Sequence, residues 1–251
     1  MIQQTIPSPI AFVPASGKPG QLFVLLHGKS ANPEQLEPLT QAIKLSFPQA
    51  LIVLPYGSFA EGEGAYSWLE QAGLDEDNYI ERVRGALPAL IAYIQKVQAK
   101  YDLTGEHTAM AGFDQGATIA LEATLEQPNL AGRVLAFSGN YSKLPGSAPV
   151  ATTLHLLHGA DDPLIPVNDI RSLHGHLADL QGDATLDIAS RVGHEMHEAL
   201  VRQAINRLQT CIPLRSWQAA LSGLKQEEKA APDVDPHLDF LRNAKPGPTV
   251  H

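Results

Sequence analysis

Short, almost wholly apolar runs alternate along the chain with longer stretches in which apolar residues recur every third or fourth position. The short runs predict strands that are buried on both faces of a sheet, and the wider spacing predicts helices with one buried face. Strands that alternate with helices are typical of a mostly parallel sheet covered by helices on both faces. The hydrophobic pattern therefore predicts an α/β fold.

The individual elements follow from this pattern. Strands are predicted at 21–26, 50–54, 106–111, 133–137, 152–157 and 184–189, with a shorter one at 10–13. Helices are predicted at 33–45, 75–98, 117–126, 166–180, from just after His194 to 208, and at 213–224. The glycine-rich stretch 58–73 is expected to form a loop. From Lys225 the chain turns polar and rich in proline, so we expect one domain at 1–224 and a loosely ordered tail at 225–251.

Composition and charge exclude several classes of partner. With 18 Lys and Arg against 27 Asp and Glu, the formal net charge is −9, which disfavours nucleic acid and anionic membrane surfaces. No apolar stretch reaches the roughly 18 residues of a membrane span, and the N-terminus lacks the pattern of a signal peptide. The one cysteine, Cys211, excludes an internal disulfide and suits the reducing cytoplasm. The ten histidines show no zinc-binding spacing, so no metal site is predicted.

One stretch predicts a sharp turn between a strand and a helix. Gly112, Asp114 and Gly116 form a Gly-x-Xaa-x-Gly pattern at that junction, which is typical of the nucleophile elbow of α/β-hydrolases. The small residues let the backbone turn, and we expect the central residue near the left-handed conformation with its side chain exposed. Serine is the usual central residue, and here Asp114 takes its place.

Two further residues complete a triad in the chain order nucleophile, acid, histidine. Asp162 follows one predicted strand, and His194 follows the last one. The carboxyl ends of parallel strands meet at one edge of a sheet, so both side chains are expected near Asp114. His194 would move protons, and Asp162 would fix the tautomer and orientation of its ring. Asp161 is the less favoured alternative to Asp162.

The predicted site also needs donors for a developing oxyanion. The candidates are the backbone N–H groups of Lys29, after the first buried strand, and of Gln115, after the elbow residue. Trp68 is a candidate wall of the substrate pocket, although a packing role in the core suits it equally. His158 belongs to a second His-Gly pair, and we interpret it as structural.

These motifs resemble the phospholipase/carboxylesterase family, the small lidless esterases that include the acyl-protein thioesterases. The matching pieces are Leu25-Leu26-His27-Gly28, Trp68, Gly112-Phe113-Asp114-Gln115-Gly116-Ala117, His158-Gly159-Ala160-Asp161-Asp162-Pro163 and Gly193-His194. Within the family, the segments 74–78, 151–163 and 220–223 are most similar to the bacterial YpfH-type esterases. The resemblance covers residues 22–224 and implies an α/β-hydrolase fold without a large cap domain.

The resemblance also implies a reaction. It implies hydrolysis of short-chain carboxylic esters or thioesters through an acyl-enzyme, with a small-molecule ester as substrate and without a cofactor. The implied roles fall on Asp162, His194 and the amides of Lys29 and Gln115. The oligomeric state is left open, and a homodimer is compatible with the sequence.

Asp114 departs from the Gly-Phe-Ser-Gln-Gly sequence that the resemblance leads one to expect. A carboxylate that attacked an ester would form a mixed anhydride, which lies uphill, so one interpretation is an esterase framework with weak or absent activity. A second is a dehalogenase or epoxide hydrolase, whose Asp nucleophile attacks a saturated carbon. Against it, residues 140–151 are too few for a cap, and Ser30 stands where such enzymes carry proline. A third is a protein that binds a ligand without turnover.

The substitution also predicts a geometry. An aspartate should keep the elbow intact, and its carboxylate should pair with His194. We expect one carboxylate oxygen to point toward the amides of Lys29 and Gln115, because the N-terminus of the following helix favours an anion.

Overall fold

The computed structural model describes residues 6–15, 17–62 and 64–216. Contacts divide the chain after Cys211 into one unit at 1–211 and another at 212–251. The sequence-based boundary at 224 and the tail at 225–251 lie outside the described residues. Of the helix predicted at 213–224, the described part is helical at 214–216.

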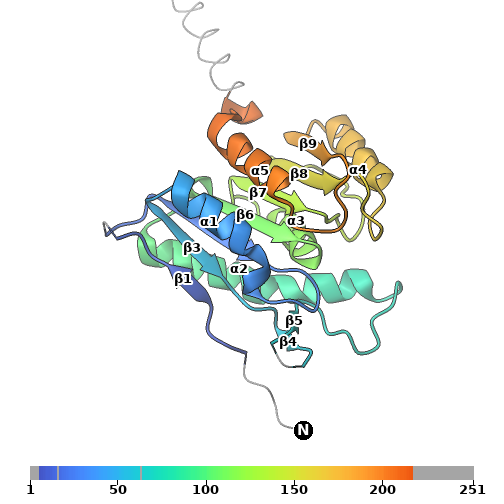
Figure 1. The fold of residues 1–251 in the computed structure, drawn as a ribbon, viewed down its shortest axis with the longest axis horizontal. Helices are drawn as coiled ribbons and strands as arrows, with labels where there is room; N and C mark the ends of the chain where they lie inside the picture. The colour runs from blue at the N-terminus through green and yellow to red at the C-terminus, as the bar shows by residue number, and fades with distance from the viewer. Residues whose placement is uncertain (1–5, 16, 63, 217–251) are drawn as a thin grey trace, which may run out of the picture. The chain divides into compact units, whose positions relative to one another are not determined.

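A seven-stranded sheet forms the centre of the first unit, with the strand order β1-β3-β2-β6-β7-β8-β9 (Figure 1). The strands are β1 (Ile10–Phe12), β2 (Gln21–Leu26), β3 (Ala50–Leu54), β6 (Thr108–Phe113), β7 (Arg133–Phe137), β8 (Thr153–Gly159) and β9 (Ala184–Ala189). Only the edge strand β1 runs antiparallel to its neighbour within this sheet. The prediction of a mostly parallel sheet is confirmed.

Helices cover both faces of the sheet, and each face carries its own apolar core. The helices are α1 (Glu37–Ser46), α2 (Tyr79–Tyr101), α3 (Gln115–Glu126), α4 (Val167–Asp179) and α5 (Glu198–Thr210), with short 3-10 helices at Pro33–Leu36 and Gly105–His107. Apolar residues of α2, α3 and α4 pack on one face, and those of α1 and α5 pack on the other. This arrangement is the α/β-hydrolase fold that the sequence predicts.

Several predicted boundaries are wrong by a few residues, and local polar side chains explain two of them. The helix predicted from 75 begins at Tyr79, since Asp75 and Asn78 exchange side-chain to backbone hydrogen bonds of 3.0 and 3.2 Å. The strand predicted from 106 begins at Thr108, since Thr104 and His107 form a capping box just before it. The strand also ends later than predicted, at Phe113 rather than at residue 111, directly before the elbow.

The stretch 58–73, predicted as a loop, contains a small hairpin of β4 (Phe59–Ala60) and β5 (Tyr66–Ser67). Its second strand pairs with Ala31 through two backbone hydrogen bonds of 2.7 and 3.1 Å. The Ser67 hydroxyl also accepts a 2.9 Å hydrogen bond from the N–H of Ser30. The hairpin thus fixes the turn that follows β2.

The segment between β7 and β8 is short, spanning only residues 138–152, and it carries no cap domain. This agrees with the fold class expected from the resemblance. Within the described part of the chain, no helix has both the length and the apolar character needed to cross a membrane.

A buried histidine, His155 on β8, links three neighbouring strands away from the predicted site. Its ring lies 2.9 Å from the Thr185 hydroxyl, and its other nitrogen accepts a 3.3 Å hydrogen bond from Arg133. Burial lowers the pKa of His155 to about 4, and the guanidinium groups of Arg133 and Arg207 act in the same direction. The folded protein therefore holds this ring neutral.

We expect His155 to make the fold sensitive to mild acid. In the unfolded chain the ring binds a proton near pH 6.5, whereas the folded state resists protonation down to about pH 4. The stabilisation is therefore complete above pH 6.5 and lost as pH falls toward 4, with about 2 kcal/mol lost by pH 5. Urea unfolding at pH 7.5 and pH 5 should show this loss, and His155→Gln should reduce it. Equal losses in parent and variant would contradict the assignment.

Candidate functional site

The elbow at Asp114 joins β6 to α3 through a strained residue. Its φ of 51° is positive, as predicted, but its ψ of −119° lies far from the left-handed helical value of about +47°. The expectation of a left-handed conformation is therefore wrong in ψ, and the tolerance of aspartate for that conformation does not apply. Surrounding structure must hold this residue in place.

The glycines flanking Asp114 bring three backbone segments into contact. A methyl group at Gly112 would overlap with the backbone of Gly116, and one at Gly116 would overlap with the carbonyl groups of Leu26 and His27. The end of β2, the end of β6 and the first turn of α3 can approach this closely only without side chains at these two positions. Steric constraint therefore explains why the motif has glycine at positions 112 and 116.

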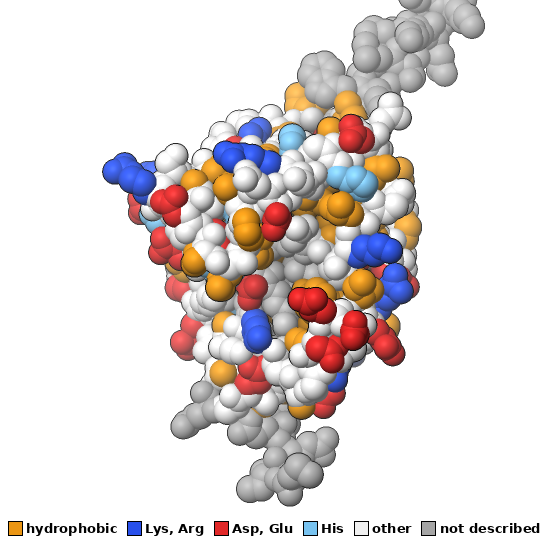
Figure 2. Space-filling model, turned by 90° about the vertical axis from the view of Figure 1, so that its right-hand side faces the viewer, with side chains coloured by type: hydrophobic (Ala, Val, Ile, Leu, Met, Phe, Trp, Pro, Cys, Tyr) orange, Lys and Arg blue, Asp and Glu red, His pale blue; other side chains and the backbone are white. Residues whose placement is uncertain are grey.

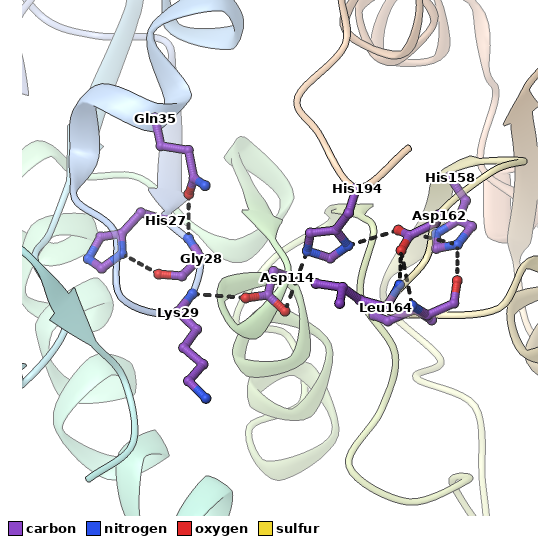
Figure 3. A network of polar contacts seen from close by, with 10 residues as sticks. His27, Gly28, Lys29, Gln35, Asp114, His158, Asp162, Leu164 and His194 are labelled. Atoms are coloured by element: carbon purple, nitrogen blue, oxygen red, sulfur yellow. Dashed lines mark hydrogen bonds and ion pairs between the residues drawn. The ribbon is translucent and has the colours of Figure 1, made fainter. Parts of the chain in front are cut away.

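The Asp114 carboxylate lies between a backbone amide and an imidazole (Figure 3). Its Oδ2 accepts a 2.9 Å hydrogen bond from the N–H of Lys29, and its Oδ1 lies 3.8 Å from Nε2 of His194. The side chain makes no capping hydrogen bond to α3, although the N–H of Gln115 has no acceptor among the described residues. The structure thus brings Asp114 to one of the two expected amides.

His194 lies between two carboxylates. Its Nδ1 donates a 2.8 Å hydrogen bond to Oδ2 of Asp162, while its Nε2 is directed toward Asp114 (Figure 3). The ring also packs against Phe113, with centroids 4.8 Å apart. Of the two adjacent aspartates, Asp162 reaches the imidazole and Asp161 is exposed to solvent.

Asp162 is 7% exposed, and its carboxylate accepts hydrogen bonds at both oxygens. Its Oδ1 accepts hydrogen bonds of 2.9 and 3.0 Å from the N–H groups of Leu164 and Ile165. Burial acts to raise the pKa of Asp162, but these two amides and the His194 ring together hold that pKa below its usual value. The acid therefore stays ionised, and it orients the imidazole through its second oxygen.

His158 supports the turn that holds Asp162. Its Nε2 donates a 2.9 Å hydrogen bond to the carbonyl of Ile165 and lies 3.7 Å from Oδ2 of Asp162. The ring is 1% exposed, and its Nδ1 has no partner in the described part of the chain. His158 therefore has a structural role, as inferred from the sequence, and it lies next to Asp162.

We expect His158→Leu to loosen the contact between Asp162 and His194. Leucine removes the ring donor from the partly buried carbonyl of Ile165, which costs up to about 1–3 kcal/mol. The downfield proton NMR signal of the His194 Nδ1–H should broaden or disappear at neutral pH. His158→Gln, whose amide can donate to the same carbonyl, should retain it. An unchanged signal in both variants would show that the turn does not depend on His158.

The turn that presents Lys29 is held by the buried ring of His27. Nδ1 of His27 donates to the carbonyl of Gly28 at 2.8 Å, and Nε2 accepts from the N–H of Gly57 at 2.9 Å. Burial lowers the pKa of His27, while the Gly28 carbonyl opposes this in part. A neutral ring with a fixed tautomer thus braces the backbone just before Lys29.

Trp68 lies behind this turn and is only 4% exposed. Its indole N–H donates a 2.7 Å hydrogen bond to the carbonyl of His27. The indole also packs against the imidazole of His27 in a tilted arrangement, with ring centroids 5.3 Å apart. These contacts make Trp68 a support for the turn, as the packing alternative expects. Its role as a wall of the substrate pocket stays a prediction.

The side chain of Gln115 is a site component that the sequence did not reveal. Its Oε1 accepts hydrogen bonds from the N–H groups of Trp68 at 2.7 Å and Leu69 at 3.3 Å. It thereby ties the first residue of α3 to the segment that carries Trp68. These partners are 47 and 46 residues away along the chain, so no local motif could indicate them.

Together these residues form a row of carboxylate, imidazole and carboxylate. The row can move a proton through His194, and the amide of Lys29 binds a carboxylate oxygen at one end of it. Among the described residues, no group of three or more His, Cys, Asp or Glu side chains could hold a metal ion.

Comparison with protein families and curated proteins gives consistent matches. Residues 9–212 match the model of the phospholipase/carboxylesterase family. The chain is 36% identical to esterase YpfH of Escherichia coli (strain K12) over 215 residues, which cover 85% of this chain and 93% of that esterase.

Solved structures share the architecture. The crystal structure of esterase PE8 superposes with a TM-score of 0.74 at 28% identity, covering 82% of this chain and 99% of that one. The Bacillus cereus carboxylesterase superposes with a TM-score of 0.68 at 17% identity, covering 81% and 94%. At 17% identity, the second match supports the fold alone.

Proposed function

Since this chain belongs to the phospholipase/carboxylesterase family, we propose that its site is built to hydrolyse small carboxylic esters or thioesters and that Asp114 keeps this activity weak or absent. The observation that carries the proposal is the position of the Asp114 carboxylate. It stands at the elbow, within 3.8 Å of His194, and occupies the amide of Lys29 at 2.9 Å.

Each residue has a role in the proposed reaction. A nucleophile at position 114 would attack the ester carbonyl after His194 removes its proton, and His194 would return the proton to the leaving alcohol or thiol. Asp162 would orient the imidazole and stabilise its charged form. The amides of Lys29 and Gln115 would bind the oxyanion, where loss of one donor typically costs about 2.7–4 kcal/mol of transition-state stabilisation.

Two features make Asp114 a poor nucleophile for esters. Its attack would give a mixed anhydride, which is higher in energy than the ester it replaces. Its Oδ2 also holds the Lys29 amide, so an ester carbonyl would have to displace a carboxylate from the anion site. Replacing Asp114 with serine should remove both obstacles, and ester hydrolysis by that variant tests the proposal.

A second candidate reaction is displacement at a saturated carbon, as in dehalogenases. Oδ1 of Asp114 accepts no hydrogen bond in the described part of the chain and lies 3.8 Å from Nε2 of His194, so it could attack a carbon and form an ordinary ester. Halide release from 1-bromobutane by the unaltered chain would favour this reaction. Tight binding of an ester without hydrolysis, in the chain and in its Asp114→Ser variant alike, would instead favour a binding protein.

The setting of the proposed enzyme follows from the composition. The single cysteine, Cys211, fits a reducing compartment, so we place the enzyme in the cytoplasm. Its substrate is a small ester, and no nucleic acid partner is proposed for a chain of net charge −9. A homodimer stays a prediction.

A further inference from the structure

A trough of about 250 Å³ lies between the second half of α2 and the β1–β3 edge of the sheet. It has no residue in common with the site around Asp114 and His194. Its lining residues are Ala11, Leu51, Val53, Tyr93, Lys96, Val97, Lys100 and Tyr101. Most of this surface is apolar, and the polar groups come from two lysines and two tyrosines.

The trough exists because β1 turns its smallest side chain toward α2. Successive strand residues face opposite sides of a sheet, and Ile10 and Phe12 pack into the core on the α1 side. Ala11 therefore faces α2, where a methyl group leaves the edge of the sheet underfilled. Leu51 and Val53 of the neighbouring β3 form the apolar floor.

The rim of the trough is cationic in an otherwise acidic protein. Lys96 and Lys100 lie one helical turn apart on α2, and no Asp or Glu is among the described lining residues. The chain has a net charge of −9, and acidic side chains gather in the lower half of the face shown in Figure 2. The ammonium group of Lys100 lies 5.0 Å from the ring of Tyr101, and Lys96 has no ion-pair partner among the described residues.

The two tyrosines add hydroxyl donors to the rim. Burial raises the pKa of Tyr93, and the nearby Tyr101 adds to this effect. The Tyr93 hydroxyl therefore stays protonated at neutral pH. Both rings are half-buried beside the two lysines. Two lysines and two tyrosines thus line the trough above an apolar floor.

We propose that this trough binds the anion of a short- or medium-chain fatty acid. The acyl chain would lie along Leu51, Val53 and Val97, and the carboxylate would lie between Lys96 and Lys100. The volume is below the roughly 300–1,000 Å³ of drug-sized ligand sites, which suits a short acyl chain. The inference does not depend on the proposed function, although such an acid is the product class of ester hydrolysis.

Calorimetric titration of the full chain with octanoate tests the proposal. Octanoate should bind, and hexanoate should bind about tenfold more weakly because two methylene groups fewer are buried. Octylamine, which has the same chain and the opposite charge, should not bind. Lys96→Ala combined with Lys100→Ala should weaken octanoate at least tenfold, while Lys143→Ala, which removes an exposed lysine elsewhere, should not.

A second variant tests the volume of the trough. Ala11→Leu fills it and should abolish binding, while Ala92→Leu adds the same bulk on the exposed face of α2 and should not. Circular dichroism establishes that each variant is folded, and the lysine pair remains decisive where Ala11→Leu does not fold. Octanoate binding that survives the lysine changes would place the ligand elsewhere and overturn the proposal, as would no binding at millimolar octanoate.

Discussion

Changing Asp114 to serine is expected to raise the rate of p-nitrophenyl acetate hydrolysis by about three orders of magnitude or more, since loss of the nucleophile alone can cost a serine hydrolase about 10⁶-fold. The hydroxyl would stand at the same strained elbow, next to a ring already oriented by Asp162 at 2.8 Å. Removal of the carboxylate would also free the amide of Lys29. An acyl-serine is an ordinary ester, so the intermediate is no longer uphill.

A matched variant separates these two effects. Asp114→Ala frees the Lys29 amide but supplies no nucleophile, so its rate should stay close to that of the parent. Steady-state assays with one short and one long p-nitrophenyl ester would compare the parent and the two variants. A serine variant no faster than the alanine variant would show that position 114 is not a nucleophile position.

In the Asp114→Ser background, a further Asp162→Asn change is expected to lower kcat by about 10³–10⁴-fold. The carbonyl oxygen of the new amide can still accept from the N–H groups of Leu164 and Ile165, so the turn should persist. Its NH₂ group would face Nδ1 of His194, where the present carboxylate accepts a hydrogen bond. The ring would then adopt the wrong tautomer and could not act as a base.

The neighbouring Asp161 provides the control for this change. It is exposed and one residue away, so Asp161→Asn in the same background should leave kcat unchanged. Rates over pH 5–9 would give both values with one substrate. An equal loss in the two variants would mean that charge near the turn matters, rather than a specific hydrogen bond to His194.

Much of the fold could be predicted from the sequence because its signals are local. The runs at 21–26, 50–54, 133–137 and 184–189 match strands to the residue, since each is a short and mostly apolar run. Asp114, Asp162 and His194 each follow their own predicted strand, so the sequence also predicts that they lie at one edge of the sheet. The structure brings these three side chains together as that topology requires.

The supporting parts of the site could not be predicted because they depend on contacts distant in sequence. The sequence suggests Trp68 as a wall of the substrate pocket. Its position in the structure is set by hydrogen bonds to His27 and Gln115, which lie 41 and 47 residues away. The hairpin that holds Ser30 and Ala31 has strands of only two residues, too short for a periodic pattern.

The conformation of Asp114 could be predicted only in part for a similar reason. The motif required a positive φ, but the ψ of −119° is imposed by the packing of β2 and β6 against α3. That conformation directs the carboxylate toward Lys29 rather than onto the amide of Gln115. One anion donor of the predicted pair is therefore occupied, and the other is left without an acceptor among the described residues.

The most direct measurement is covalent labelling with diisopropyl fluorophosphate, followed by intact-mass analysis and peptide mapping. The Asp114→Ser variant should gain one phosphoryl adduct on the peptide that contains position 114, and the parent should gain none. The adduct should disappear when His194→Ala is added, because the imidazole activates the hydroxyl. An unlabelled serine variant, or labelling that persists without His194, would contradict the assignment of this elbow as the nucleophile position of an esterase.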